Sequence, residues 1–209
     1  MGTQSVDFVG ALLSWDVIKD VLLAFFILYI FLIHRKEINK LKQFSMQDEL
    51  TGLASKGKFY SDAQLSIARI HRENQKSGNR AKKNVSVAFI DLDGFKAVND
   101  GNHLRGDRIL VEFARYISSK TRESDTVARF GGDEFVILLN NSSQEDALEF
   151  CFKLQEGLSS YWFDSRNEPL QLGASISSAS TSEGFDGATE MIEKADARMQ
   201  IQKKINKRL

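Results

Sequence analysis

Four acidic residues in two separate segments are the strongest candidates for chemistry in this chain. Asp91 and Asp93 come at the end of an apolar run that begins at Asn84, and Asp133 and Glu134 directly follow a pair of glycines. Because side chains alternate along a strand, Asp91 and Asp93 should point to the same side. If the two segments meet, several carboxylates converge on one place.

Converging carboxylates repel one another, and a bound divalent cation is the usual relief. Oxygen ligands with no His or Cys nearby favour Mg²⁺ or Mn²⁺ over softer metals. Metal ions held in this way stabilise both the attacking and the leaving oxygen when a phosphoryl group is displaced. The acidic residues therefore predict displacement at phosphorus, with divalent metal held between the two segments.

A predicted hairpin and a predicted central strand position these acids. Residues 126–130 and 134–139 have the composition of two strands, and Gly131-Gly132 is the predicted turn between them, since glycines accept the positive φ of tight turns. The run before Asp91 is apolar on both faces, as in a buried central strand. Taken alone, a Gly-Gly-Asp-Glu segment also fits an ordinary solvated turn.

The composition allows one domain and an N-terminal extension within 209 residues. The 28 basic and 28 acidic residues cancel, so net charge gives no reason to expect nucleic acid binding. The single cysteine excludes an intrachain disulfide and a thiolate metal site. Cys151 is expected to be a buried core thiol, on a helical stripe with Ala147, Leu148, Leu154 and Leu158.

The N-terminal segment, residues 1–45, carries a candidate membrane helix. Residues 21–33 are apolar, but as a helix they cover only about 20 Å of a bilayer core about 30 Å thick. Extending the helix back through Trp15 reaches spanning length, with Asp16, Lys19 and Asp20 near the outer interface. The alternative is an amphipathic helix buried in a dimer.

Basic residues after the apolar run predict the orientation. Arg35, Lys36, Lys40 and Lys42 follow it, which places the C-terminal part in the cytoplasm under the inner membrane. Apolar residues at positions 38, 41 and 44 then predict a short helical stalk that pairs with a second copy.

Helices and strands intersperse in the remaining chain, residues 46–209, and predict an α+β fold with a central antiparallel sheet flanked by helices. Expected elements are a helix capped by Ser55 and ending near Glu73, a helical turn over 95–100, a helix over 107–120, a helix capped by Ser143, a strand over 170–177, and a last helix that buries Ile192, Ala195, Met199 and Ile205.

Several motifs together resemble the GGDEF-domain diguanylate cyclase family over roughly residues 46 to 209. They occur in the family order and spacing: Asp48-Glu49-Leu50-Thr51-Gly52-Leu53, Asp91-Leu92-Asp93-Gly94-Phe95-Lys96-Ala97-Val98-Asn99-Asp100, His103-Leu104-Arg105-Gly106-Asp107 and Gly131-Gly132-Asp133-Glu134-Phe135. The resemblance implies a palm-like sheet and an enzyme that joins two GTP into cyclic di-GMP, releasing pyrophosphate, with each chain of a homodimer holding one GTP.

The resemblance also implies roles for individual residues. Two Mg²⁺ or Mn²⁺ ions would bind Asp91, the Leu92 carbonyl and Asp133, and Glu134 would complete coordination or assist deprotonation of the attacking hydroxyl. Asp93 has two interpretations: it is a further metal ligand, or it caps the following turn.

The substrate residues follow from the same motifs. Asn99 and Asp107 match the positions that bind guanine, although a residue such as Asp107 at a helix start can also be a cap. His103 more often supports the loop than takes part in chemistry. Triphosphate contacts are expected from Lys96, Lys203, Lys207 and the backbone of Phe95 and Lys96.

An Arg-x-x-Asp pattern lies upstream of the glycine pair. Arg122 and Asp125 match the family's inhibitory site for cyclic di-GMP, and Arg129 is expected to join that surface. The alternatives to a cyclase are an inactive domain that acts as a cyclic di-GMP or GTP receptor, and an interaction protein that uses the domain only to dimerise. A membrane sensor partner is a further possibility.

The sequence departs from the family pattern outside the predicted metal ligands. The departures are Ala54-Ser55-Lys56-Gly57, the short Gly101-Asn102 link, Ser177 in place of Gly, Gln200 in place of Tyr and Asn206 in place of Gly. They concern the geometry of the guanine pocket and the contacts to phosphate.

Overall fold

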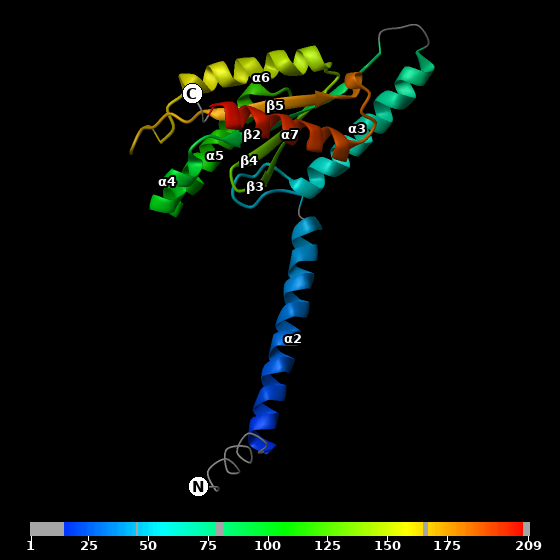
Figure 1. Ribbon diagram of the computed structural model, residues 1–209. Helices are drawn as coiled ribbons and strands as arrows, with labels where there is room; N and C mark the ends of the chain where they lie inside the picture. Colours follow the sequence, from blue (N-terminus) through cyan, green and yellow to red (C-terminus); the bar gives the residue numbers. More distant parts are fainter. Residues whose placement is uncertain (1–14, 45, 78–81, 165–166, 207–209) are drawn as a thin grey trace. The chain divides into compact units, whose positions relative to one another are not determined.

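The computed structural model describes residues 15–44, 46–77, 82–164 and 167–206. The chain forms two compact units, residues 1–44 and residues 45–209. The first contains helix α2, Trp15–Phe44 (Figure 1). Its stretch Val17–Arg35 is long and apolar enough to cross a membrane, with a mean hydropathy of 2.2. The side chains of the expected stalk residues at 38, 41 and 44 lie outside the described part.

The second unit is built on a five-stranded sheet in the order β1-β3-β4-β2-β5. The strands are β1 (Ala54–Ser55), β2 (Val85–Leu92), β3 (Thr126–Gly131), β4 (Glu134–Asn140) and β5 (Ala174–Ser180). All neighbours pair antiparallel except β1, which lies parallel to β3. The predicted α+β class with an antiparallel central sheet is confirmed, with this short parallel edge added.

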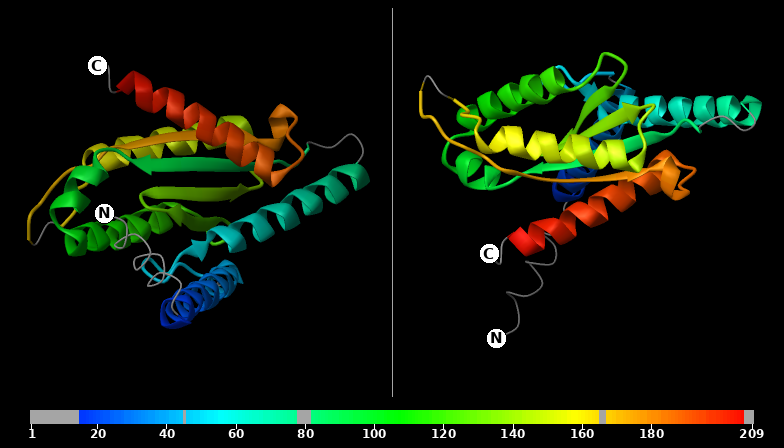
Figure 2. Two further views of the ribbon diagram at one scale, coloured as in Figure 1. Left: turned by 60° about the horizontal axis from the view of Figure 1, so that its bottom comes forward. Right: turned by 90° about the horizontal axis from the view of Figure 1, so that it is seen from above.

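Helices cover both faces of the sheet, as the views in Figure 2 show. Helices α5 (His103–Lys120) and α6 (Gln144–Ser159) pack on one face, and α3 (Lys56–Lys76) and α7 (Ala188–Asn206) pack on the other. Alternate residues of β2 enter the two cores, which explains why this strand is apolar throughout. The short helices α4 (Phe95–Gly101) and η1 (Thr181–Glu183) complete the unit.

Local capping confirms several expected boundaries. The Ser55 side chain accepts from Lys58 N at 3.2 Å at the start of α3, which continues to Lys76 rather than ending near Glu73. Ser143 and Asp146 form the expected capping box of α6. Cys151 is buried, and burial raises the pKa of its thiol to about 12.

Three sequence expectations are wrong in detail. Helix α5 begins at His103 instead of Asp107, because the side chain of Asn102 accepts from Arg105 N at 3.1 Å and caps the helix there. The last strand is Ala174–Ser180, not 170–177, since Leu170 pairs only with Phe163 in an isolated bridge. Leu148 is 53% exposed, because it lies one position around α6 from the buried stripe.

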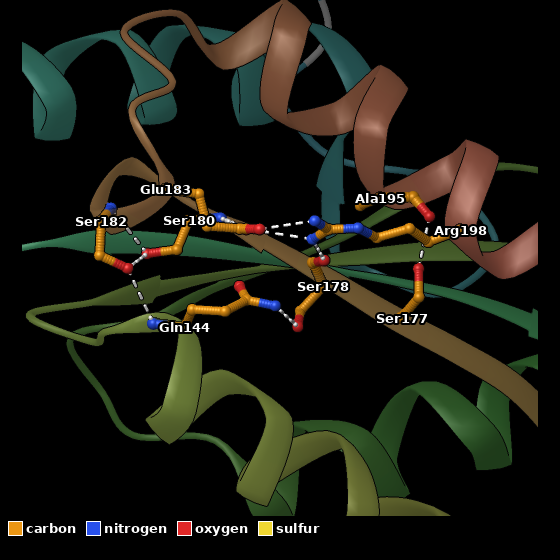
Figure 3. A network of polar contacts seen from close by, with 8 residues as sticks. All are labelled: Gln144, Ser177, Ser178, Ser180, Ser182, Glu183, Ala195 and Arg198. Carbon is orange, nitrogen blue, oxygen red and sulfur yellow. Dashed lines mark hydrogen bonds and ion pairs between the residues drawn. The ribbon is translucent and has the colours of Figure 1, made fainter.

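Polar contacts fasten α7 to the edge strand β5 (Figure 3). Arg198 donates to the Ser178 carbonyl at 2.6 Å and pairs with Glu183 at 2.5 Å. The hydroxyl of Ser177 donates to the Ala195 carbonyl. Ser177 is one of the departures noted above, and its hydroxyl thus joins strand to helix, which fixes the helix that carries Lys203.

Candidate active site

The two acidic segments meet at the adjoining ends of β2 and β4. Asp91 and Glu134 are direct partners in the antiparallel register, and such partners have Cβ atoms about 5 Å apart. Leu92 N also donates to the carbonyl of Asp133 at 3.3 Å. A pocket of about 600 Å³ opens here and is lined by Asp91, Leu92, Asp93, Gly94, Phe95, Lys96, Asp133 and Lys203.

The glycine pair forms the expected tight turn, displaced by one residue. Gly131 pairs with Glu134, so Gly132 and Asp133 are the two turn residues, and the register shifts between Arg129 and Gly131. The φ angles of 144° at Gly131 and 53° at Gly132 explain why glycine occupies both positions. The turn brings Asp133 to the end of β2.

The charges of the cluster act on one another. Burial, followed by the charge of Asp91, raises the pKa of Asp133. Burial also raises the pKa of Glu134, with further contributions from Asp196, Asp91 and Asp133. Carboxylates whose ionised form is disfavoured in this way gain most from a bound cation.

Lys203 supplies a positive charge to the same cluster from the last turn of α7. Its ammonium donates to the buried carboxylate of Asp91. Partial burial lowers the pKa of Lys203, but this hydrogen bond and the charges of Asp91, Asp133 and Asp93 raise it overall. The structure therefore pairs a predicted phosphate contact with a predicted metal ligand.

The side chains at this site supply only some of the oxygen ligands that a hard divalent cation needs. Among the described residues, no three Asp, Glu, His or Cys side chains lie in a group that could hold a metal alone. An ion here would take Asp91 and Asp133 together with backbone carbonyl, water and phosphate oxygens, which suits Mg²⁺. Asp93 is engaged elsewhere: it accepts from Ser175 Oγ at 2.9 Å. The alternative that Asp93 caps the next turn is wrong, because Gly94 occupies the cap position of α4 without a side-chain bond.

The predicted base-recognition residues lie on α4 and α5. Asp107 lines a second pocket, of about 850 Å³, together with Leu50, Leu104, Arg108, Val111, Glu112, Arg115, Tyr161, Asp164 and Asn167. Asn99 packs against Gly106, where an added Cβ would lie 2.4 Å from its Oδ1. His103 Nδ1 is 3.3 Å from the same oxygen, which fits the expected supporting role. Asp107 lies inside α5 and is not its cap.

The remaining predicted residues fall in three places. Lys96 and the backbone of Phe95 border the first pocket, and Lys207 lies outside the described residues. Arg122 and Asp125 border a small pocket of about 60 Å³, where Asp125 accepts from Arg122 N at 3.1 Å. Asp125 also accepts from Asn140 N at 3.0 Å, so its carboxylate shapes the turn.

Arg129 lies apart from that turn. It donates to the Gly132 carbonyl and pairs with Asp48, and it is therefore placed beside the glycine turn. Sequence reasoning missed that Asp48 pairs with Arg129 beside this turn, and that Arg105 pairs with Asp164, which lines the second pocket. Asp48 stands in a recognised motif, which was a usable signal, whereas Asp164 lies in a segment with no motif.

Comparisons with known proteins agree with this geometry. A family model described as "Diguanylate cyclase, GGDEF domain" matches residues 45–208. The bifunctional diguanylate cyclase/cyclic di-GMP phosphodiesterase MucR of Pseudomonas aeruginosa is 36% identical over 162 residues, which are 77% of this chain and 22% of MucR. Diguanylate cyclase A of Treponema denticola is 30% identical over 159 residues, 76% of this chain and 42% of the relative.

Solved structures show the same fold. The GGDEF domain of TpbB (YfiN) from Pseudomonas aeruginosa superposes with a TM-score of 0.68 at 30% identity, covering 76% of this chain and 88% of that one. The diguanylate cyclase SiaD, solved with its activator SiaC from the same organism, gives a TM-score of 0.59 at 29% identity, covering 97% and 77%. The chain thus spans well under half the length of the curated relatives named above, which it matches at 22% and 42% of their lengths.

Proposed function

Because the chain belongs to the GGDEF diguanylate cyclase family, we propose that it condenses two molecules of GTP into cyclic di-GMP and releases pyrophosphate. The observation that carries the proposal is one pocket lined by both Asp91 and Asp133, with Lys96 and Lys203 on its rim. Phosphoryl transfer requires acidic residues that hold divalent cations, placed beside basic side chains that bind phosphate.

We propose two Mg²⁺ or Mn²⁺ ions per site, held by Asp91, Asp133 and the Leu92 carbonyl, with Glu134 next to them. Bound metal supplies positive charge to the α-phosphate and to the oxygens that attack and leave. Lys96 and Lys203 bind the triphosphate. Glu134, whose pKa is raised, is suited to accept the proton of the attacking 3′-hydroxyl.

Base selection is assigned to Asp107 and Asn99. A carboxylate accepts from both N1–H and N2–H₂ of guanine, whereas adenine would place a lone pair opposite it. A polar group that the bound base covers and leaves unpaired costs about 1–3 kcal/mol, so a preference for GTP over ATP is expected. The exposed position of Asp107 on the second pocket leaves its carboxylate free to bind a base.

Each domain is expected to bind one GTP and so provides only half of the reaction site. The reaction therefore requires two chains that face each other. We propose a symmetric homodimer in which each 3′-hydroxyl attacks the α-phosphorus of the opposite GTP. Helix α2 is suited to anchor both chains in the inner membrane, with the catalytic unit in the cytoplasm, and tethering raises their effective concentration. A membrane sensor protein could act through this helix.

Product feedback is proposed at Arg122 and Asp125. The Arg122 side chain can bind guanine or phosphate of cyclic di-GMP with two parallel hydrogen bonds. The receptor function stays the alternative, in which the same residues bind cyclic di-GMP but no GTP is turned over.

The experiment is turnover by the purified full chain in detergent with GTP and Mg²⁺, with cyclic di-GMP and pyrophosphate quantified. We expect Asp133→Asn to lower the rate by about 100-fold or more, as loss of a charge-stabilising group does in other enzymes. Asp186→Asn, an exposed acid beside His71, is the matched control and should leave the rate unchanged. Unchanged turnover in Asp133→Asn would refute the site. Absence of product in the wild type, with saturable cyclic di-GMP binding that Arg122→Ala removes, would favour the receptor.

A further inference from the structure

A buried aspartate in the loop that follows α6, Asp164, lines the second pocket, which also contains Asp107. The side chain of Asp164 is only 4% exposed, and its backbone has a φ of 50°. Both features are costly, because a buried carboxylate must be paired and a non-glycine residue in the left-handed region is strained. No recognised motif includes this residue.

Three side chains contact the carboxylate of Asp164. Asn167 Nδ2 donates to Oδ1 at 2.6 Å. On the other oxygen, Arg108 Nη2 donates at 3.3 Å, and Arg105 Nε lies 3.4 Å away as an ion pair without a hydrogen bond. Both arginines belong to the first two turns of α5, so the loop is bound to the beginning of that helix.

A second set of contacts extends the attachment one turn further along α5. The backbone N–H of Asp164 donates to Glu112 Oε2 at 2.8 Å. The other oxygen of Glu112 accepts from the hydroxyl of Tyr161 at 3.1 Å. The loop therefore contacts the helix at 105, 108 and 112, which are neighbours on one helical face.

In the sequence, Asp107 lies between Arg105 and Arg108, the two arginines that contact Asp164. Asp107, Arg108, Glu112 and Asp164 all line the same pocket. A rotation or shift of the first turns of α5 would move the Asp107 carboxylate relative to a bound base. A shift of this kind weakens paired hydrogen bonds to guanine and leaves general contacts largely intact.

From these contacts we infer that Asp164 is a positioning residue for purine recognition: through Arg105 and Arg108 it holds Asp107 where a guanine edge can meet it. The inference rests on the proposed function, since it assumes that Asp107 reads the base. Asp164 does not touch the base in this role. Its effect is on the choice between purines and not on the phosphate or metal contacts.

The test measures equilibrium binding of 3′-deoxy-GTP and 3′-deoxy-ATP to the full chain in detergent with Mg²⁺. Neither nucleotide has the hydroxyl needed for condensation, so turnover does not interfere. We expect Asp164→Asn to weaken 3′-deoxy-GTP binding by about tenfold and 3′-deoxy-ATP binding by less than about twofold. The preference for guanine then falls, which a general loss of stability would not produce.

Two further variants make the result specific. Glu168→Gln is the matched control: Glu168 contacts Arg105 Nη1 at 3.0 Å, but its side chain is 73% exposed. This control should bind both nucleotides as the wild type does. Asn167→Ala keeps the charges of the network and removes one donor to Asp164, so it should lower the guanine preference by about threefold even if Asp164→Asn does not fold.

The double variant Asp107→Asn/Asp164→Asn should be no weaker for 3′-deoxy-GTP than Asp107→Asn alone, because both changes remove the same interaction. Equal weakening of both nucleotides by Asp164→Asn, or additive effects in the double variant, would overturn the inference. If Asp107→Asn itself leaves the guanine preference unchanged, the inference also fails, and the fault then lies in the base site of the proposed function.

Discussion

The guanidinium of Arg129 joins the carboxylate of Asp48 to the carbonyl of Gly132. Its Nη1 lies 3.3 Å from Asp48 Oδ1, and its Nε and Nη2 donate to Gly132 O at 3.0 and 2.9 Å. Asp48 also accepts from Thr51 N at 2.8 Å and from Thr51 Oγ1 at 2.7 Å. The segment that begins the catalytic unit is thus bound to the turn that places Asp133.

Replacing this guanidinium should destabilise the domain. Arg129→Lys keeps the charge but cannot donate to Asp48 and Gly132 together, so we expect a loss of about 1–2 kcal/mol. For a chain of this size, the melting temperature should fall by about 3–6 °C in calorimetry. The exposed pair of Lys153 and Glu149 supplies the control, and Lys153→Met should change stability by less than about 0.5 kcal/mol. Equal melting of the two variants would contradict the proposed connection.

Lys203 should oppose metal binding and favour nucleotide binding. Its ammonium occupies one oxygen of Asp91, so Lys203→Met should raise the affinity for Mn²⁺ without nucleotide by about threefold or more. The same change removes a cation from the phosphate pocket and should weaken 3′-deoxy-GTP binding. Lys204→Met, at the exposed neighbouring position, should alter neither constant. Titration calorimetry measures both, and changes in the same direction would count against this assignment.

The acidic cluster should reduce the stability of the metal-free protein as the pH rises. The pKa of Asp133 is raised above its ordinary value of 3.8, mainly by burial and then by Asp91. The protonated carboxyl of Asp133 therefore contributes its full stability at pH values below the ordinary pKa. This stability is lost as the pH rises through the raised pKa of the folded protein.

Calorimetry in EDTA at about pH 4 and pH 7 checks this sign. Asp133→Asn should melt higher than the wild type at the upper pH, and the difference should shrink at the lower pH. Addition of Mg²⁺ at the upper pH should stabilise only the wild type. A variant that is less stable than the wild type at both pH values would show that Asp133 is not under strain from its neighbours.

Gly106 should be essential for the position of Asn99. A Cβ at Gly106 would lie 2.4 Å from Asn99 Oδ1 and 3.3 Å from Phe95 Cζ, so Gly106→Ala must displace the amide. We expect weaker 3′-deoxy-GTP binding by about tenfold. Gly101→Ala, where an added Cβ meets nothing within 4 Å, is the control. If both alanine variants bind alike, Asn99 has no part in recognising the base.

Arg122→Ala should relieve product inhibition without lowering the initial rate. The Arg122 side chain borders the small pocket at the turn, while the backbone of Arg122 bonds to Asp125: its N–H donates to the carboxylate, and its carbonyl accepts from Asp125 N. Removing the side chain therefore leaves the turn intact, whereas Asp125→Ala would also free the N–H of Asn140. Progress curves with added cyclic di-GMP make the comparison. Unchanged inhibition in Arg122→Ala would exclude this turn as the feedback site.

The sequence by itself determined the acidic residues, the hairpin and the layered α+β fold. Strand alternation places Asp91 on one face of β2, and the glycine pair requires a tight turn before Glu134; both are local properties of the backbone. The apolar run of β2 required cover on both faces, which the two cores provide. Helix ends were less well determined, because Asn102 and Asp107 are both acceptable caps by composition.

Only the tertiary structure decided which charges meet. Lys203 and Asp91 are 112 residues apart in the sequence, and Arg105 and Asp164 belong to different elements, so no periodicity connects them. The partner of a buried charge depends on which helices pack on which face of the sheet, and that depends on the whole core. The candidate catalytic residues could therefore be predicted from local spacing in the sequence. The ion pairs that position these residues could be seen only in the folded chain.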